Sequence, residues 1–97
     1  MITTKQRAFL RKLANPLKPI FQVGKGGIND NMIVQISEAL EARELIKVHI
    51  LNNSLLEAKE TLSEVAALCN AEPVQAIGSV FVLYKESENN KQIVLPK

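Results

Sequence analysis

The stretch PIFQVGKGGINDNMI, residues 19–33, contains three of the chain's four glycines, at Gly24, Gly26 and Gly27. The apolar run before the glycines is typical of a short strand. After them, Asn29 is a favourable helix N-cap, and apolar residues then recur at helical spacing at Met32, Ile33, Ile36 and Leu40. The segment therefore predicts a strand, a glycine loop and a helix in direct succession.

Such a loop is suited to binding phosphate groups. Glycines let a polyanion approach the peptide N–H groups, the following helix N-terminus contributes positive potential, and Lys25 adds a mobile charge. No Lys-Ser or Lys-Thr pair follows the last glycine and no GxGxxG is present, so ATP and dinucleotide loops are disfavoured. The form GxxG matches the loop with which KH domains hold single-stranded nucleic acid. Taken alone, it fits the geometry of a strand-to-helix turn equally well.

The residues before the loop predict one further helix. Thr3 and Gln6 have the spacing of a capping box, and the pair Asn15-Pro16 ends the helical pattern. The apolar stripe of this helix consists of Phe9, Leu10 and Leu13.

Alternation after the second helix predicts a half-buried strand over Glu44–Leu51, in which Lys47 and His49 face away from the apolar residues. A second capping box, from Ser54 to Glu57, predicts the start of a third helix. The residues expected on the core face of that helix are Leu55, Leu62, Val65, Ala66 and Cys69.

The last regular elements are two β-rich runs in PVQAIGSVFVLYK, residues 73–85, divided by Gly78-Ser79. A glycine at a two-residue turn predicts an antiparallel hairpin. The remaining tail, ESENNKQIVLPK, is expected either to be loose or to add a short edge strand. The order αβαβαββ predicts a single small two-layer α/β domain, residues 1–97, on a mixed four-stranded sheet.

Charge is distributed unevenly along the chain. Residues 1–29 carry six basic and no acidic residues, whereas residues 30–97 carry six basic and ten acidic residues. The net charge of +2 therefore conceals a polarised molecule. A polyanionic partner, either nucleic acid or an anionic membrane surface, is the usual reason for such asymmetry.

Other function classes find little support in the sequence. His49 and Cys69 are the only histidine and cysteine, so no nucleophile–base pair, metal-ligand cluster or disulfide is expected. We read His49 as a polar residue of the sheet face and Cys69 as a packing residue. No apolar run has the length of a membrane span, and the N-terminus lacks a signal-peptide pattern. We expect a cytoplasmic, monomeric, non-enzymatic protein without a cofactor or metal.

Three segments, LANPLKPIFQVGKGGI, LIKVHIL and AIGSVFVLYK, in this order and spacing, resemble YhbY-type proteins, which are single CRM (chloroplast RNA splicing and ribosome maturation) domains. The similarity covers residues 2 to about 95. It implies an RNA-binding domain resembling the C-terminal domain of the third bacterial initiation factor, with the GxxG loop on the RNA face. In bacteria it also implies a role around precursors of the large ribosomal subunit, so that the expected partner is ribosomal RNA or the pre-ribosomal particle.

The expected RNA site combines this loop with nearby basic residues. Because the chain has few aromatic residues, no platform for stacking bases is expected, and binding should depend on phosphates and shape. The candidate clamp is Gly24, Lys25, Gly26 and Gly27. The candidate flanking cations are Arg7, Arg11 and Lys12, with Lys18 and Lys47 as weaker candidates. The alternative is a basic module that docks on a membrane surface or a protein without binding RNA, because basic amphipathic helices also bind anionic lipid.

Overall fold

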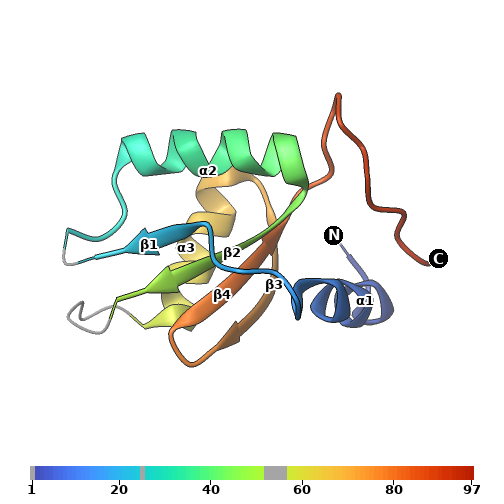
Figure 1. The fold of residues 1–97 in the computed structure, drawn as a ribbon, viewed down its shortest axis with the longest axis horizontal. Helices are drawn as coiled ribbons and strands as arrows, with labels where there is room; N and C mark the ends of the chain where they lie inside the picture. The colour runs from blue at the N-terminus through green and yellow to red at the C-terminus, as the bar shows by residue number, and fades with distance from the viewer. Residues whose placement is uncertain (1, 25, 52–56) are drawn as a thin grey trace.

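The computed structural model describes residues 2–24, 26–51 and 57–97, and Figure 1 shows their arrangement. Three helices and four strands alternate in the predicted order αβαβαββ. They are α1 (Thr4–Ala14), β1 (Phe21–Val23), α2 (Asp30–Arg43), β2 (Leu45–Ile50), α3 (Ala58–Cys69), β3 (Glu72–Ile77) and β4 (Val80–Tyr84).

The four strands form one mixed sheet in the order β1-β2-β4-β3. β1 runs parallel to β2, with Phe21 opposite Val48, and α2 makes the crossover between these two strands. β2 and β3 both pair antiparallel with β4. The β3–β4 connection is the predicted tight turn, and Gly78 has a φ of 59° there. The mixed four-stranded sheet expected from the sequence is thus confirmed.

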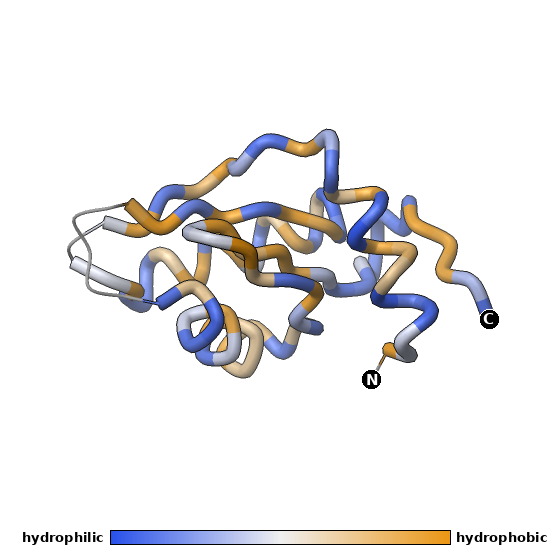
Figure 2. The backbone as a smooth tube through the Cα atoms, turned by 90° about the horizontal axis from the view of Figure 1, so that it is seen from below, coloured by the Kyte–Doolittle hydropathy of each residue, from blue (hydrophilic) through white to orange (hydrophobic). Residues whose placement is uncertain are grey.

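Helices α2 and α3 cover one face of the sheet and form the larger core with it. Apolar residues of β2 and β4 alternate toward these helices, and Val48 and Phe81 are completely buried between them. The predicted core face of α3 is confirmed for Leu62, Val65, Ala66 and Cys69, all buried. In Figure 2, the hydrophobic parts of the strands accordingly lie in the interior of the molecule.

Helix α1 packs on the opposite face of the sheet, at one end. The predicted capping box is present, since Gln6 N–H donates to Thr3 Oγ1 at 3.1 Å and Thr3 N–H donates to Gln6 Oε1 at 2.9 Å. Leu10 is buried against Val82 and Tyr84 of β4 in a second, smaller core. Helix α1 therefore adds a partial third layer to the two predicted layers. The rest of the sheet face on which α1 packs is left uncovered.

Two predicted boundaries shift in the structure. Glu57 is expected inside the third helix, but it is extended, serves as the N-cap and makes no side-chain cap hydrogen bond, so α3 begins at Ala58. Ser54 and Leu55, the other residues of that expectation, lie outside the described residues. Glu44 is expected to open the second strand, but it ends α2 with a φ of 67°, and β2 begins at Leu45.

The C-terminal tail is neither loose nor an added strand. Its backbone is held by two glutamates from the end of α2: Glu41 accepts the N–H groups of Glu88 and Asn89, and Glu44 accepts that of Ser87 at 2.8 Å. Further along the tail, Ile93 and Leu95 pack against the α1 core. The expectation from local sequence was wrong because these anchors are about 45 residues away along the chain.

Candidate nucleic-acid interface

The glycine loop connects β1 to α2 at one end of the sheet. A turn hydrogen bond from Gly27 N–H to the carbonyl oxygen of Gly24, at 3.0 Å, closes it. Lys25, the residue expected to carry the loop's charge, lies outside the described residues. The predicted strand, loop and helix in direct succession are therefore present.

The glycines of the loop do not have equal structural roles. Gly27 has a φ of 71°, a conformation that strains any residue with a Cβ atom. A Cβ at Gly24 would lie 3.6 Å from Leu51 Cδ1, which is ordinary contact. A Cβ at Gly26 would meet no atom within 4 Å. The turn thus requires glycine at position 27, whereas the space beside Gly26 is open to a ligand.

The N-terminus of α2 directly follows the loop. Asn29 is the predicted N-cap, and its Oδ1 accepts the N–H of Met32 at 2.8 Å. Ile28 and Ile33 are half-buried against the main core, so the entry to the helix is fixed by packing as well as by the cap. Asp30 is exposed in the first turn, where its carboxylate favours the helix and opposes an anionic ligand.

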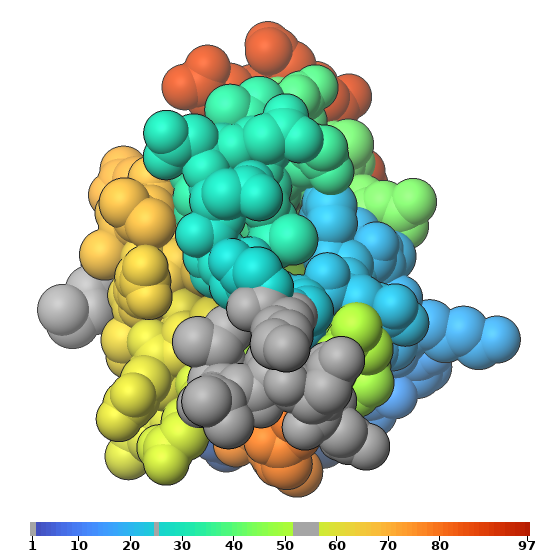
Figure 3. Space-filling view, turned by 90° about the vertical axis from the view of Figure 1, so that its left-hand side faces the viewer, coloured from blue at the N-terminus to red at the C-terminus, as the bar shows by residue number. Residues whose placement is uncertain are grey.

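Other backbone segments meet at this end of the molecule. Leu51 N–H donates to the carbonyl oxygen of Val23 at 2.9 Å, and Ile50 N–H donates to that of Ser79 at 2.7 Å. The exit of β1, the exit of β2 and the β3–β4 turn are therefore adjacent. Figure 3 views this end, with the start of α2 above the β3–β4 turn.

The basic residues of α1 lie at the other end of the molecule from the glycine loop (Figure 1), whose longest dimension is 39 Å. Arg11 and Lys12 are exposed in the last turn of α1. Arg7 is half-buried, and its Nε donates to the carbonyl oxygen of Pro73 at 3.1 Å, so part of its guanidinium is committed to β3. The structure does not bring the helix and the loop together as one compact clamp.

Lys47 and His49 lie between these two ends on the sheet face that α1 leaves uncovered. Both are half-buried and alternate with the core residues of β2, as predicted. In the register of the sheet, His49 lies between Gln22 of β1 and Val80 of β4. Lys18, in the segment between α1 and β1, lines the same pocket as Lys47. These residues form a path across the open face from the loop toward α1.

Arg43 is a further cation beside these residues. It was not among the candidate residues predicted from the sequence. It is the last residue of α2 and lines a pocket with Lys18 and Lys47. A basic residue in the last turn of a helix is an ordinary dipole partner, so its sequence position alone gives no functional signal. Only the fold places it beside the other two cations.

Most of these cations have no acidic partner among the residues that the structure describes. The one ion pair found there joins Lys91 Nζ to Glu86 Oε1 at 2.9 Å, and it lies in the tail. Over the same residues, no cluster of three or more His, Cys, Asp or Glu side chains is arranged to hold a metal ion. None of the described helices is long and apolar enough to cross a bilayer.

The glycine loop, the αβαβαββ order and the uncovered basic sheet face can be compared with known proteins. Residues 2–85 match the family model described as the CRS1 / YhbY (CRM) domain. The chain belongs to the CRM-domain family.

Two curated relatives and one solved structure are similar over nearly their whole length. The chain is 56% identical to the Bacillus subtilis protein named "Probable RNA-binding protein YqeI", over 99% of this chain and 100% of the relative. It is 34% identical to a Haemophilus influenzae protein named "RNA-binding protein", over 99% and 96%. The solution structure of the hypothetical protein SAV1595 from Staphylococcus aureus is 53% identical, with a TM-score of 0.83, over 99% of this chain and 100% of that one. The CRM-type fold is thereby shown for this chain.

Proposed function

We propose that this CRM-domain protein binds RNA, gripping the sugar-phosphate backbone through the GxxG loop and through the basic residues of α1 and the open sheet face. Its similarity to proteins named as RNA-binding supports the ligand class. The single observation that carries the loop's role is the open space beside Gly26 at the entry to α2. There, peptide N–H groups and the helix N-terminus can meet a phosphate without side-chain obstruction.

Because the loop and α1 are far apart, the bound RNA must extend across the molecule to contact both. Because the two lie at opposite ends of a molecule 39 Å long, one phosphate cannot contact both. An RNA strand or helix that follows the sheet face past Lys47 and Lys18 reaches both. Such contacts are to the backbone, so they position the RNA and carry little sequence information.

A charge reversal at Lys25 tests the role of the loop. Lys25→Glu replaces an attraction by a repulsion beside the phosphates, and we expect a loss of affinity that is nearly uniform across RNA sequences. Lys91→Glu in the tail is the matched control, because Lys91 lies outside the glycine loop, α1 and the open sheet face. Its ion pair with Glu86 is exposed, so breaking it should cost little stability. Equal affinity of the two variants, at unchanged melting temperature, would reduce the loop to a structural turn.

We further propose that the RNA is ribosomal and that the protein acts in assembly of the large ribosomal subunit. The support is the resemblance to YhbY-type proteins, whose expected partner is the precursor of that subunit. Sedimentation of a tagged copy through sucrose gradients is the test. Enrichment with large-subunit precursors over mature ribosomes is expected, and equal association with both would remove the assembly role while leaving RNA binding intact.

The alternative of membrane docking through α1 makes a different prediction. Leu10 of the apolar stripe of α1 is buried against the sheet, as is Ala14, whereas Leu13 is partly exposed. Only part of the stripe is therefore left for insertion into a bilayer. Flotation with anionic liposomes, run beside an RNA gel shift, separates the two functions.

A further inference from the structure

A groove runs between α1, the start of β2 and the C-terminal tail. It consists of two adjoining pockets of about 300 and 160 Å³, which share Leu17, Arg43 and Leu45 as lining residues. We call it the α1–tail groove. The larger pocket reaches the lower end of the size range of small-ligand sites, roughly 300–1,000 Å³.

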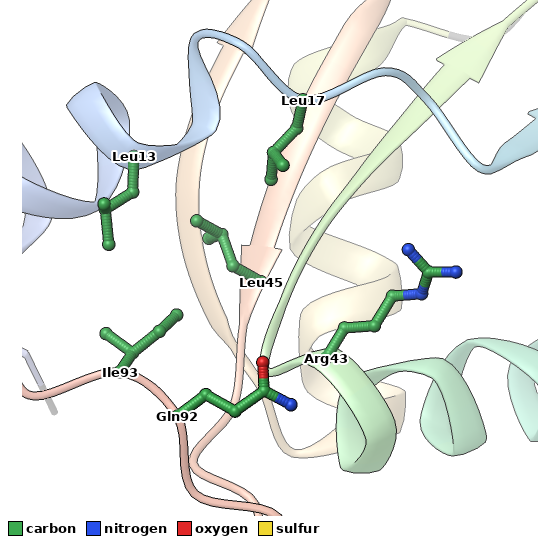
Figure 4. A pocket seen from close by; sticks show the side chains of 6 residues that line it. All are labelled: Leu13, Leu17, Arg43, Leu45, Gln92 and Ile93. Atoms are coloured by element: carbon green, nitrogen blue, oxygen red, sulfur yellow. The ribbon is translucent and has the colours of Figure 1, made fainter.

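The larger pocket has aliphatic walls. Leu13 and Leu17 face Ile93 of the tail across it, and Leu45 lies between them (Figure 4). Leu13, Leu17 and the nearby Ile20 are each 39% exposed. The sequence predicts Leu13 on the apolar stripe of the first helix, but over a third of its surface faces solvent. Leu17 borders both pockets, so these partly exposed aliphatic side chains line the groove along its length.

Two polar side chains line this pocket, Arg43 from α2 and Gln92 from the tail, and the guanidinium of Arg43 points away from Gln92 (Figure 4). Gln92 is held in place, because its Nε2 donates to the carbonyl oxygen of Ala42 at 2.8 Å and its backbone N–H donates to Glu44 at 2.6 Å. Its Oε1 points toward Leu45 and can accept a hydrogen bond. The groove therefore offers one fixed acceptor at Gln92 and, apart from it, the guanidinium donor of Arg43, which lines both pockets.

The groove is positively charged. Lys18, Arg43 and Lys47 all line the smaller pocket, and no acidic side chain is among the described residues that line either pocket. Glu44, which lies between Arg43 and Leu45 in the sequence, is completely buried and accepts three tail N–H groups. The groove thus combines aliphatic walls with cations at its rim. This combination suits an anionic ligand that also has an apolar group with hydrogen-bonding edges.

We propose that the α1–tail groove binds one unstacked nucleobase of the RNA, with the flanking phosphates at Lys18 and Lys47. A base presents a flat apolar face to the leucines, and it presents edge donors and acceptors to Gln92 and Arg43. RNA recognition of this kind targets bulges and loops, where bases are already unstacked. The proposal rests on RNA binding and adds a base-binding site that the glycine loop does not supply.

The first test compares two RNA hairpins with the same stem, one fully paired and one with a single-nucleotide bulge. We expect the protein to bind the bulged RNA about fivefold more tightly, which corresponds to about 1 kcal/mol for burying one base in the groove. Leu17→Ala removes no charge and should bring this ratio close to one. Arg43→Gln should do the same and also weaken both affinities.

The matched controls are Leu68→Ala and Lys59→Gln, two exposed positions of α3 away from the groove. Both should keep the preference for the bulge. Melting temperatures of all four variants identify any loss that comes from unfolding rather than from the groove.

The second test detects the base directly by NMR of the leucine methyl groups. An aromatic ring seated on Leu13 and Leu17 shifts their methyl resonances upfield through its ring current. We expect this shift with the bulged RNA and not with the paired one.

The outcomes distinguish the base site from RNA binding itself. Salt-sensitive binding to both hairpins without a preference or methyl shift would overturn the base site and leave RNA binding in place. No binding to either hairpin would overturn the proposed function as well. Methyl shifts with an acidic, leucine-containing peptide but with neither RNA would assign the groove to a protein partner and overturn the proposal.

Discussion

The carboxylate of Glu44 accepts the backbone N–H of Gln92 at 2.6 Å, although the two residues are 48 positions apart in the chain. The same carboxylate also accepts the N–H groups of Ser87 and Ile93, each at 2.8 Å. One buried side chain at the end of α2 therefore fixes the course of the tail and, with it, one wall of the α1–tail groove. Stability of the tail and shape of the groove depend on the same residue.

Removal of this anchor should destabilise the whole domain. Glu44→Ala leaves three tail N–H groups without their charged acceptor, and we expect a loss of about 3 kcal/mol in the free energy of unfolding. Urea denaturation measures this loss, with Glu64→Ala on the exposed face of α3 as the control. The amides of Gln92 and Ile93 should also lose protection from hydrogen exchange. Retained protection in Glu44→Ala would mean that apolar packing alone holds the tail.

Acid should weaken the same anchor. Burial raises the pKa of Glu44, but the N–H donors of Ser87, Gln92 and Ile93 outweigh this and lower it below the ordinary value of 4.5. The pKa of Glu41 is lowered by the N–H of Glu88, the hydroxyl of Ser87 and the N–H of Asn89. Because both folded-state pKa values are lowered, their stabilisation is complete above the unfolded-state value and is lost as pH falls through the folded-state values.

The expected result is a melting temperature that is steady above about pH 5 and falls progressively below it. Circular dichroism melts between pH 7 and pH 3 measure this. Glu44→Gln cannot be protonated at that position, so its melting temperature should start lower and fall less steeply in acid. A parallel acid decline in both proteins would place the acid sensitivity elsewhere in the chain.

Affinity for RNA should depend steeply on salt. If the loop, Lys18, Lys47 and the end of α1 together neutralise three to five phosphates, log affinity should fall with log salt at a slope of about −2 to −4. Arg11→Gln should reduce the slope by about one if Arg11 contacts a phosphate. Fluorescence anisotropy over a salt series gives these slopes, and a flat response would contradict backbone recognition.

The fold could be predicted where a local signal specifies it. The caps at Thr3 and Asn29, the alternation of β2 and the turn at Gly78 all appear as expected, because each depends on residues within a few positions. Local signals also misled: the capping-box pattern ending at Glu57 does not start α3. The tail could not be predicted, because its partners are two glutamates distant in sequence.

The site could be predicted only in part for the same reason. The loop and the basic N-terminal segment are visible in the sequence, but their separation to opposite ends follows from packing of α1 on the far end of the sheet. Arg43 and Gln92 belong to a helix end and a polar tail, and neither position signals a pocket without the fold.

In the glycine loop, the requirement of the turn and the contact with a ligand can be tested at two different residues, Gly27 and Gly26. Gly27 has a φ of 71°, so Gly27→Ala should cost about 1–2 kcal/mol of stability through backbone strain. A methyl group at position 26 would meet open space, so Gly26→Ala should change stability by less than about 0.5 kcal/mol. Urea denaturation of both variants tests this difference. A loss at Gly26→Ala as large as that at Gly27→Ala would mean that both glycines serve the turn.

Charge at the same position then tests the ligand. Gly26→Glu puts a carboxylate into the open space beside the entry to α2, and RNA affinity should fall because the carboxylate repels the phosphates and occupies their place. Ala67→Glu, on the exposed face of α3, adds the same charge away from the loop and should lower affinity little. If the two variants bind RNA equally, net charge alone sets the affinity, and the loop has no direct contact with the backbone.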